Sequence, residues 1–150
     1  MPQSLSSILI HLIFSTKNRQ PLITANVETE LHKYMATIFR GCKSPTLLIG
    51  GTEDYLHALF ALSRTLAMAD LVEEVKTSSS KWMKTKGDEL RQFQWQAGYG
   101  AFSIGQSNVE VLKRYTSKQK EHHRSRSFQD ELRSLCKRYG VEIDERYVWD

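Results

Sequence analysis

The order of strand-like and helix-like patterns along the chain restricts its fold more than any other feature. Residues 5–14 alternate with a period of two, as in a β-strand whose two faces are both apolar. One face carries Ile8, Ile10, Leu12 and Phe14, and the other carries Leu9, His11 and Ile13. A helix is predicted from about Asn26 to Gly41, because apolar residues recur there at helical spacing.

The middle of the chain predicts a hairpin followed by a second helix. Thr46–Gly50 and Tyr55–Ala61 are short apolar strands, and Gly51–Asp54 has the residue types of a turn. Asp70, with Glu73 three positions later, is typical of a helix N-cap. The Thr-Ser-Ser-Ser tract at positions 77–80, called the serine tract below, is expected to interrupt that helix, because serine competes for backbone hydrogen bonds.

The last third of the chain predicts one strand and two more helices. Aromatic residues between Phe93 and Ile104 alternate loosely around Gly98 and Gly100, which suggests a strand bent at the glycines. Ser107 or Asn108 would begin a helix that runs to about His123. Ser127 would cap a final helix over residues 128–138.

These elements follow the order β-α-β-β-α-β, with two helices after it. The order predicts an α+β fold, ferredoxin-like or RRM-like, whose antiparallel sheet has helices on one face and additional C-terminal helices. The open face of such a sheet often binds nucleic acid. A chain of 150 residues suits one domain, residues 1–150.

Composition and charge exclude several classes of protein. Forty per cent hydrophobic residues are enough for a packed core, and the longest apolar run, residues 8–14, is too short to span a membrane. Cys42 and Cys136 have no metal-binding or redox spacing. Between Glu110 and Arg126, six Lys and Arg oppose two Glu, so this stretch carries a net charge of +4, equal to that of the whole chain. The asymmetry favours a polyanionic partner, although a charge run is also typical of a solvated face.

Two residue pairs are candidates for chemistry. Tyr55 and His57 lie two apart on a predicted strand and therefore point to the same side, where His57 could bind a metal or be a buried structural histidine. Tyr115 and Gln119 lie four apart on a predicted helix inside the basic stretch. A tyrosine there could act as a nucleophile, or it could simply pack at the edge of the core.

A third group of candidates is cationic. Lys17 and Arg19 follow the first strand, while Lys76, Lys81 and Trp82 belong to the second helix. Cations with a nearby aromatic ring suit single-stranded nucleic acid, because charge follows the backbone and rings stack on bases. The alternative interpretation is surface lysines around a core tryptophan.

Several ordered motifs carry a resemblance to a known family. They are His11–Arg19, Gly50–His57, Ser78–Trp82, Trp95–Ser103, Arg114–His123 and Asp144–Asp150. Through them the chain resembles, over nearly its whole length, the single-tyrosine HUH transposases of insertion sequences. The resemblance is to the branch that includes the REP-associated tyrosine transposases.

The resemblance implies a mechanism and a site. It implies that a divalent metal, Mg²⁺ or Mn²⁺, is held by two histidines on a strand and by Gln119. Tyr115 then attacks a scissile phosphate of hairpin-containing single-stranded DNA and forms a 5′-phosphotyrosine. It also implies a homodimer that acts on nucleoid DNA in the bacterial cytoplasm. Arg114 and Lys118, beside the tyrosine, join the cations above as expected DNA contacts.

The sequence departs from the family's pattern at the metal site. Tyr55 stands where the first histidine of the pair is expected, which leaves His57 and Gln119 as the implied protein ligands. A neutral phenol is a poor metal ligand. Three explanations stay open: Glu53 supplies a carboxylate, metal binds only together with substrate phosphate, or the chain binds DNA hairpins without cleaving them.

Overall fold

A four-stranded antiparallel sheet forms the centre of the computed structural model, which describes residues 2–117 and 127–150. The strands follow the order β2-β3-β1-β4, which confirms the ferredoxin-like prediction. The elements are β1 (Leu9–Ser15), α1 (Ala25–Gly41), β2 (Thr46–Gly51), β3 (Tyr55–Ala61), α2 (Met68–Met83), β4 (Gly100–Ile104), α3 (Val109–Ser117) and α5 (Phe128–Tyr139). Short 3-10 helices are η1 (Lys17–Arg19), η2 (Asp88–Leu90) and η3 (Gln106–Asn108).

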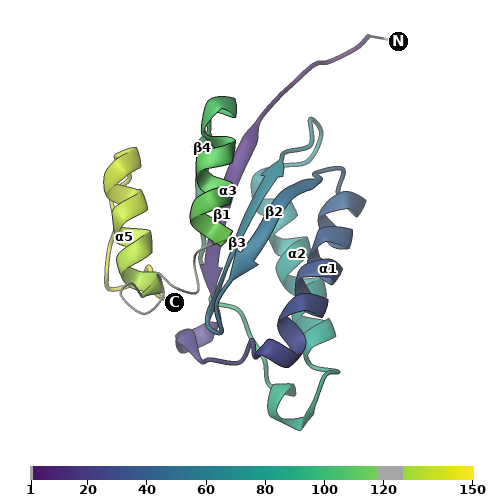
Figure 1. Ribbon diagram of the computed structural model, residues 1–150, viewed down its shortest axis with the longest axis vertical. Coiled ribbons are helices and arrows are strands. Elements are labelled where there is room, and N and C mark those ends of the chain that lie inside the picture. Colours follow the sequence, from purple (N-terminus) through teal and green to yellow (C-terminus); the bar gives the residue numbers. More distant parts are fainter. Residues whose placement is uncertain (1, 118–126) are drawn as a thin grey trace.

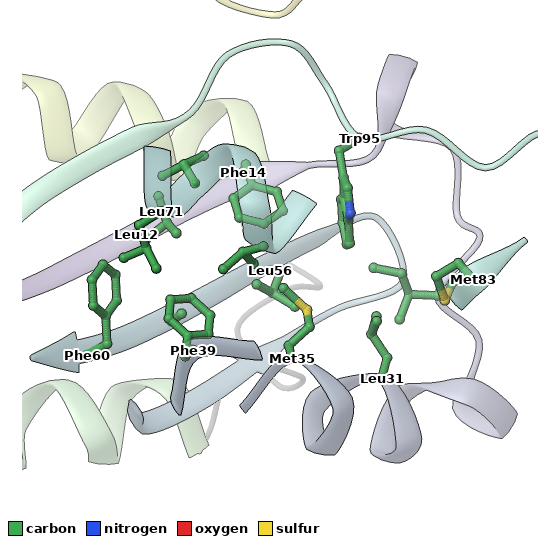
Figure 2. Close-up of a cluster of buried hydrophobic side chains, with 14 of the residues drawn as sticks. Leu12, Phe14, Leu31, Met35, Phe39, Leu56, Phe60, Leu71, Met83 and Trp95 are labelled. Carbon is green, nitrogen blue, oxygen red and sulfur yellow. The ribbon is translucent and has the colours of Figure 1, made fainter. Parts of the chain in front are cut away.

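One face of the sheet forms the main hydrophobic core with α1 and α2 (Figure 1). Leu12 and Phe14 of β1 point into this core, as the alternating pattern predicts. From α1, buried side chains repeat every four residues, namely Leu31, Met35 and Phe39 (Figure 2). This spacing places them on one side of the helix and explains how α1 covers the sheet.

The opposite face of the sheet is covered by α3 and α5, so the expectation of an open face is wrong (Figure 1). Leu9 packs in one cluster with Val109 of α3. Ile13 packs in another with Phe128 and Leu132 of α5. Because α3 and α5 cover this second face of the sheet, β1 is buried on both of its faces. The apolar side of α5 is narrow.

The start and middle of α2 differ from the sequence prediction. The helix begins at Met68 without a side-chain cap, and Asp70 lies in its first turn. It also continues through the serine tract. The Ser79 hydroxyl donates to the carbonyl oxygen of Val75 at 2.6 Å, and the Ser80 hydroxyl donates to that of Phe93 at 3.3 Å. The hydroxyls therefore find acceptors that leave the helical hydrogen bonds in place.

The remaining predictions are largely confirmed. The segment from Phe93 is strand-like only in part, since Trp95 forms an isolated bridge with Thr16 and β4 begins at Gly100. The third predicted helix is α3, and its expected end near His123 lies outside the described residues. Ser127 caps α5, because its hydroxyl accepts a hydrogen bond from the Asp130 amide at 3.1 Å. Among the described residues, no helix has the length and apolar character needed to cross a membrane.

Gly51 permits the tight turn that leads into β3. A Cβ atom at this position would lie 2.3 Å from the Tyr55 carbonyl oxygen, so the backbone would have to move. We expect Gly51→Ala to lower the free energy of unfolding by about 1–3 kcal/mol. Gly41, where a Cβ meets nothing within 4 Å, is the matched control, and Gly41→Ala should be neutral or slightly stabilising. Equal stability of the two variants in urea denaturation would contradict this assignment.

Candidate active site

Five polar side chains converge between the sheet and its C-terminal helices, and we call them the polar cluster. They are His11 of β1, Tyr55 and His57 of β3, Tyr115 of α3 and Glu131 of α5. His11, Tyr55, His57 and Glu131 are buried, and Tyr115 is partly buried. Tyr55 and His57 point to the same side of β3, as their spacing predicts.

The two histidines form a stacked, hydrogen-bonded pair. Nε2 of His11 lies 2.7 Å from Nδ1 of His57, and their rings are 4.9 Å apart at an angle of 12°. One proton is shared along this contact. If His57 donates it from Nδ1, the lone pair on His57 Nε2 points away from His11 and toward Glu131.

Glu131 joins the histidine pair to both tyrosines. Its Oε2 accepts a hydrogen bond of 2.5 Å from the Tyr55 hydroxyl, and its Oε1 accepts one of 2.8 Å from the Tyr115 hydroxyl. The same Oε1 lies 3.6 Å from His57 Nε2. The Glu131 carboxylate therefore faces three residues of the predicted site. They are Tyr55, which stands where the first histidine is expected, the expected nucleophile Tyr115, and His57.

Burial and charge shift the pKa values of two members of the polar cluster. Burial, with a smaller contribution from His57, lowers the pKa of His11 to about 3, so this imidazole is neutral at physiological pH. Burial alone would raise the pKa of Glu131. The His57 imidazole and the hydrogen bonds from both tyrosines outweigh it and lower that pKa to about 2. Glu131 is therefore an ionised carboxylate at neutral pH.

Nε2 of His57 is buried and has no hydrogen-bond partner within the described part of the chain. Its distance of 3.6 Å from Glu131 is too long for a hydrogen bond. A buried nitrogen that faces a carboxylate across such a gap suits a divalent cation, so the residues present fit the metal that the resemblance implies. The described residues contain no group of three His, Cys, Asp or Glu side chains able to hold a metal. Other ligands would have to come from water, substrate or Gln119.

The structure brings together only part of the predicted site. His57 and Tyr115 meet through Glu131, whereas Gln119 and Lys118 lie outside the described residues. Glu53 lies in the bend before β3 with an exposed side chain, and the carboxylate that faces His57 belongs to Glu131. The explanation that Glu53 replaces the missing ligand is therefore not supported.

The predicted cations fall into two regions. Arg114 is next to Tyr115 on α3, and η1 carries Lys17 and Arg19 directly after the end of β1 that pairs with Tyr55. Lys76 and Lys81 belong to α2, which covers the opposite face of the sheet. There they line a groove of about 520 Å³ between α2 and the segment 94–99, together with Lys84, Trp95 and Tyr99.

The ammonium group of Lys76 binds the protein itself. It donates to the carbonyl oxygens of Gln96 and Gly98 at 2.8 and 2.6 Å, and it lies 4.9 Å from the centre of the Phe14 ring. Burial lowers the pKa of Lys76 to about 8. Trp82 is also engaged within the fold, since its ring stacks on Tyr34 at 5.3 Å.

We expect Lys76→Met to reduce the free energy of unfolding by about 1–3 kcal/mol, because it keeps the aliphatic stem but removes the donor from partly buried carbonyl groups. Lys81→Met, on the exposed side of the same helix, should change it by less than about 0.5 kcal/mol. Thermal or urea unfolding of both variants measures the difference. A Lys76→Met protein as stable as the Lys81→Met protein would contradict a structural role for Lys76.

Sequence reasoning missed two members of the polar cluster. His11 is a polar residue in an otherwise apolar strand, on the same face as Ile13. A histidine on a buried face was the sequence signal that could have marked it as a site residue. Glu131 lies among the apolar residues Phe128, Leu132 and Cys136 of α5, so a helical projection would place it near the buried side. Nothing in the sequence indicates that this helix lies over β3.

Comparisons with known proteins agree with the fold. No curated protein sequence matches the chain. Among solved structures, a candidate transposase from Deinococcus radiodurans R1 has a TM-score of 0.64 at 20% identity and covers 79% of this chain and 98% of its own. A REP-associated tyrosine transposase bound to a REP hairpin has a TM-score of 0.61 at 11% identity. The match covers 82% of this chain and 72% of the transposase chain. At these identities the likeness shows the fold.

The sequence itself identifies the family. The family model described as "Transposase IS200 like" matches residues 4–119, which include β1 through α3 and the tyrosine at position 115. This range covers more than half of the chain. The protein therefore belongs to the IS200-like transposase family.

Proposed function

We propose that this chain is a metal-dependent transposase that cleaves and transfers single-stranded DNA at hairpins, with Tyr115 as the nucleophile. The observation that carries the proposal is the position of the Tyr115 hydroxyl, 2.8 Å from a carboxylate oxygen that lies 3.6 Å from Nε2 of His57. That nitrogen is buried and has no hydrogen-bond partner among the residues that the structure describes. Family membership supports DNA transposition, and the structural neighbour bound to a REP hairpin supports a hairpin substrate.

The proposed reaction exchanges one phosphodiester for another. The Tyr115 oxygen forms a bond to the scissile phosphorus, the bond from phosphorus to the 3′ oxygen breaks, and a free 3′-OH leaves. Glu131 orients the attacking oxygen by accepting the hydrogen bond of the Tyr115 hydroxyl; the phenolic proton passes to solvent, and the departing 3′ oxygen takes up a proton from solvent. A 3′-OH from another DNA end can then attack the phosphotyrosine, which restores the tyrosine and joins the strands.

The metal would be held by His57 and, from the resemblance, by Gln119. When bound, it supplies Lewis-acid polarisation of the scissile phosphate. The chain's own residues orient the site: His11 fixes the ring of His57 through the 2.7 Å contact, and Tyr55 fixes Glu131. Such partners hold ligands in the geometry that a metal requires.

The DNA would approach from the side of α3 and η1. Arg114, Lys17 and Arg19 are the proposed phosphate contacts there, and Lys81 would contact a further stretch of strand through the groove on α2. Lys118, which lies outside the described residues, is a further proposed phosphate contact because it is close to Tyr115 in the sequence. The resemblance further supports a homodimer in the bacterial cytoplasm, and light scattering in solution tests the dimer.

The test is a covalent-adduct assay with single-stranded hairpin DNA and Mg²⁺ or Mn²⁺. A 5′-phosphotyrosine attaches the protein to the DNA segment on the 3′ side of the cut. A 3′-end label should therefore migrate with the protein on a denaturing gel, and a 5′-end label should appear on a shorter free strand. Chelation of the metal should remove both products.

Tyr55, at the position of a metal-binding histidine, favours one alternative: a relative that binds hairpins without cutting them. That alternative predicts a gel shift with hairpin DNA but no adduct with either label in any divalent metal. This outcome would overturn the cleavage proposal and retain DNA binding.

A further inference from the structure

Glu131 faces His57, the second residue of the expected histidine pair. Its carboxylate reaches over β3 from α5 and is 4% exposed, so it is withdrawn from solvent. Tyr55, at the first position of the expected histidine pair, does not face the gap beside His57 as a ligand. Its hydroxyl instead donates to Oε2 of Glu131 at 2.5 Å.

The gap between Glu131 and His57 has the dimensions of a cation site. Metal–ligand bonds to imidazole nitrogen and carboxylate oxygen are about 2.1 Å long. Two ligand atoms 3.6 Å apart are closer than twice that length, so the distance permits one cation to contact both. The nitrogen has no hydrogen-bond partner among the described residues, and in the tautomer with the proton on Nδ1 it presents a lone pair toward the carboxylate oxygen.

We infer that Glu131 and His57 together form the divalent-cation site of this chain, with Tyr55 as the positioning residue of the carboxylate. Replacement of histidine by tyrosine at position 55 therefore exchanges one ligand for another that comes from α5. This inference rests on the metal-dependent function proposed above, and it assigns the ligand set that the sequence left open.

The hydrogen bond from Tyr115 to Glu131 places the proposed nucleophile at the proposed cation site. Because its hydroxyl donates to the same Oε1 that faces His57, the nucleophile lies next to the cation site. A carboxylate that binds the cation would therefore also align the attacking oxygen. The ligand set and the nucleophile come from three elements that the covered face of the sheet brings together, β3, α3 and α5.

The test measures Mn²⁺ binding to the whole chain by isothermal titration calorimetry and by electron paramagnetic resonance. The wild type should bind one Mn²⁺, with or without hairpin DNA. Glu131→Gln, which keeps the shape and an oxygen acceptor, should weaken binding at least tenfold. Tyr55→Phe should weaken it by a smaller factor, because the ligand stays but its orientation loosens. Glu142→Gln, an exposed glutamate beyond α5, is the matched control and should bind as the wild type does.

Because a variant can also be less stable than the wild type, each protein is unfolded thermally with and without Mn²⁺. The shift in unfolding temperature that Mn²⁺ causes is then compared within each protein. A bound ion raises the unfolding temperature, so the wild type and Glu142→Gln should show a shift that Glu131→Gln lacks. The inference is overturned if Glu131→Gln binds Mn²⁺ as tightly as the wild type, or if the wild type binds none at millimolar concentration. A wild type that binds Mn²⁺ through Glu131 but forms no adduct would instead overturn the cleavage proposal alone.

Discussion

Replacement of Tyr115 by phenylalanine should abolish the covalent protein–DNA adduct. The hydroxyl oxygen is the atom proposed to attack phosphorus, so its removal eliminates the reaction itself, with an expected loss of at least about 10³-fold. The phenylalanine ring keeps the packing of α3 on the sheet. The variant should also bind hairpin DNA with nearly unchanged affinity, because the phosphate contacts proposed for the neighbouring cations remain.

Two other tyrosines serve as controls for this experiment. Tyr99 and Tyr147 are 40% and 65% exposed, so the hydroxyl of either could reach the phosphates of bound DNA. Tyr99→Phe and Tyr147→Phe should form the adduct at the wild-type rate. If Tyr115→Phe still forms it while one of these variants does not, the nucleophile has been assigned to the wrong residue.

The fold could be predicted from the sequence because its signals are local. The alternation in β1 and the four-residue spacing of Leu31, Met35 and Phe39 each depend on residues close in the chain. The start of α2 could not be predicted in this way. Its N-terminus lies two residues before Asp70 and has no side-chain cap, so capping residues do not mark it in the sequence.

The candidate site was only partly accessible to sequence reasoning. Tyr55 and His57 could be placed on one side of a strand, since residues two apart share a face. Their partner Glu131 is 76 residues from Tyr55 and belongs to a helix whose position over the sheet no local pattern reveals. The ligand problem posed by Tyr55 therefore has a candidate solution only in three dimensions.

The position of Glu131 depends on how α5 is anchored. Phe128 is fully buried and lies one helical turn before Glu131, and its ring is 5.4 Å from that of Tyr55 and 6.2 Å from that of Trp149. Phe128, Leu132 and Cys136 form a single buried stripe, while most of the rest of α5 is polar. Loss of the largest side chain in this stripe should therefore release the helix and withdraw the carboxylate from His57.

We expect Phe128→Ala to lower the free energy of unfolding by about 3–5 kcal/mol and to speed hydrogen exchange mainly in α5. Phe60→Ala is the matched comparison, because Phe60 is equally buried but packs on Phe39 in the main core. In urea denaturation, Phe60→Ala should lower the free energy of unfolding by a similar amount. Its faster hydrogen exchange, however, should extend through the sheet and α1. Below their unfolding temperatures, Phe128→Ala should lose Mn²⁺ binding while Phe60→Ala retains it. If the two variants show the same exchange pattern and the same Mn²⁺ affinity, α5 does not dock as a separate unit, and the site does not depend on this anchor.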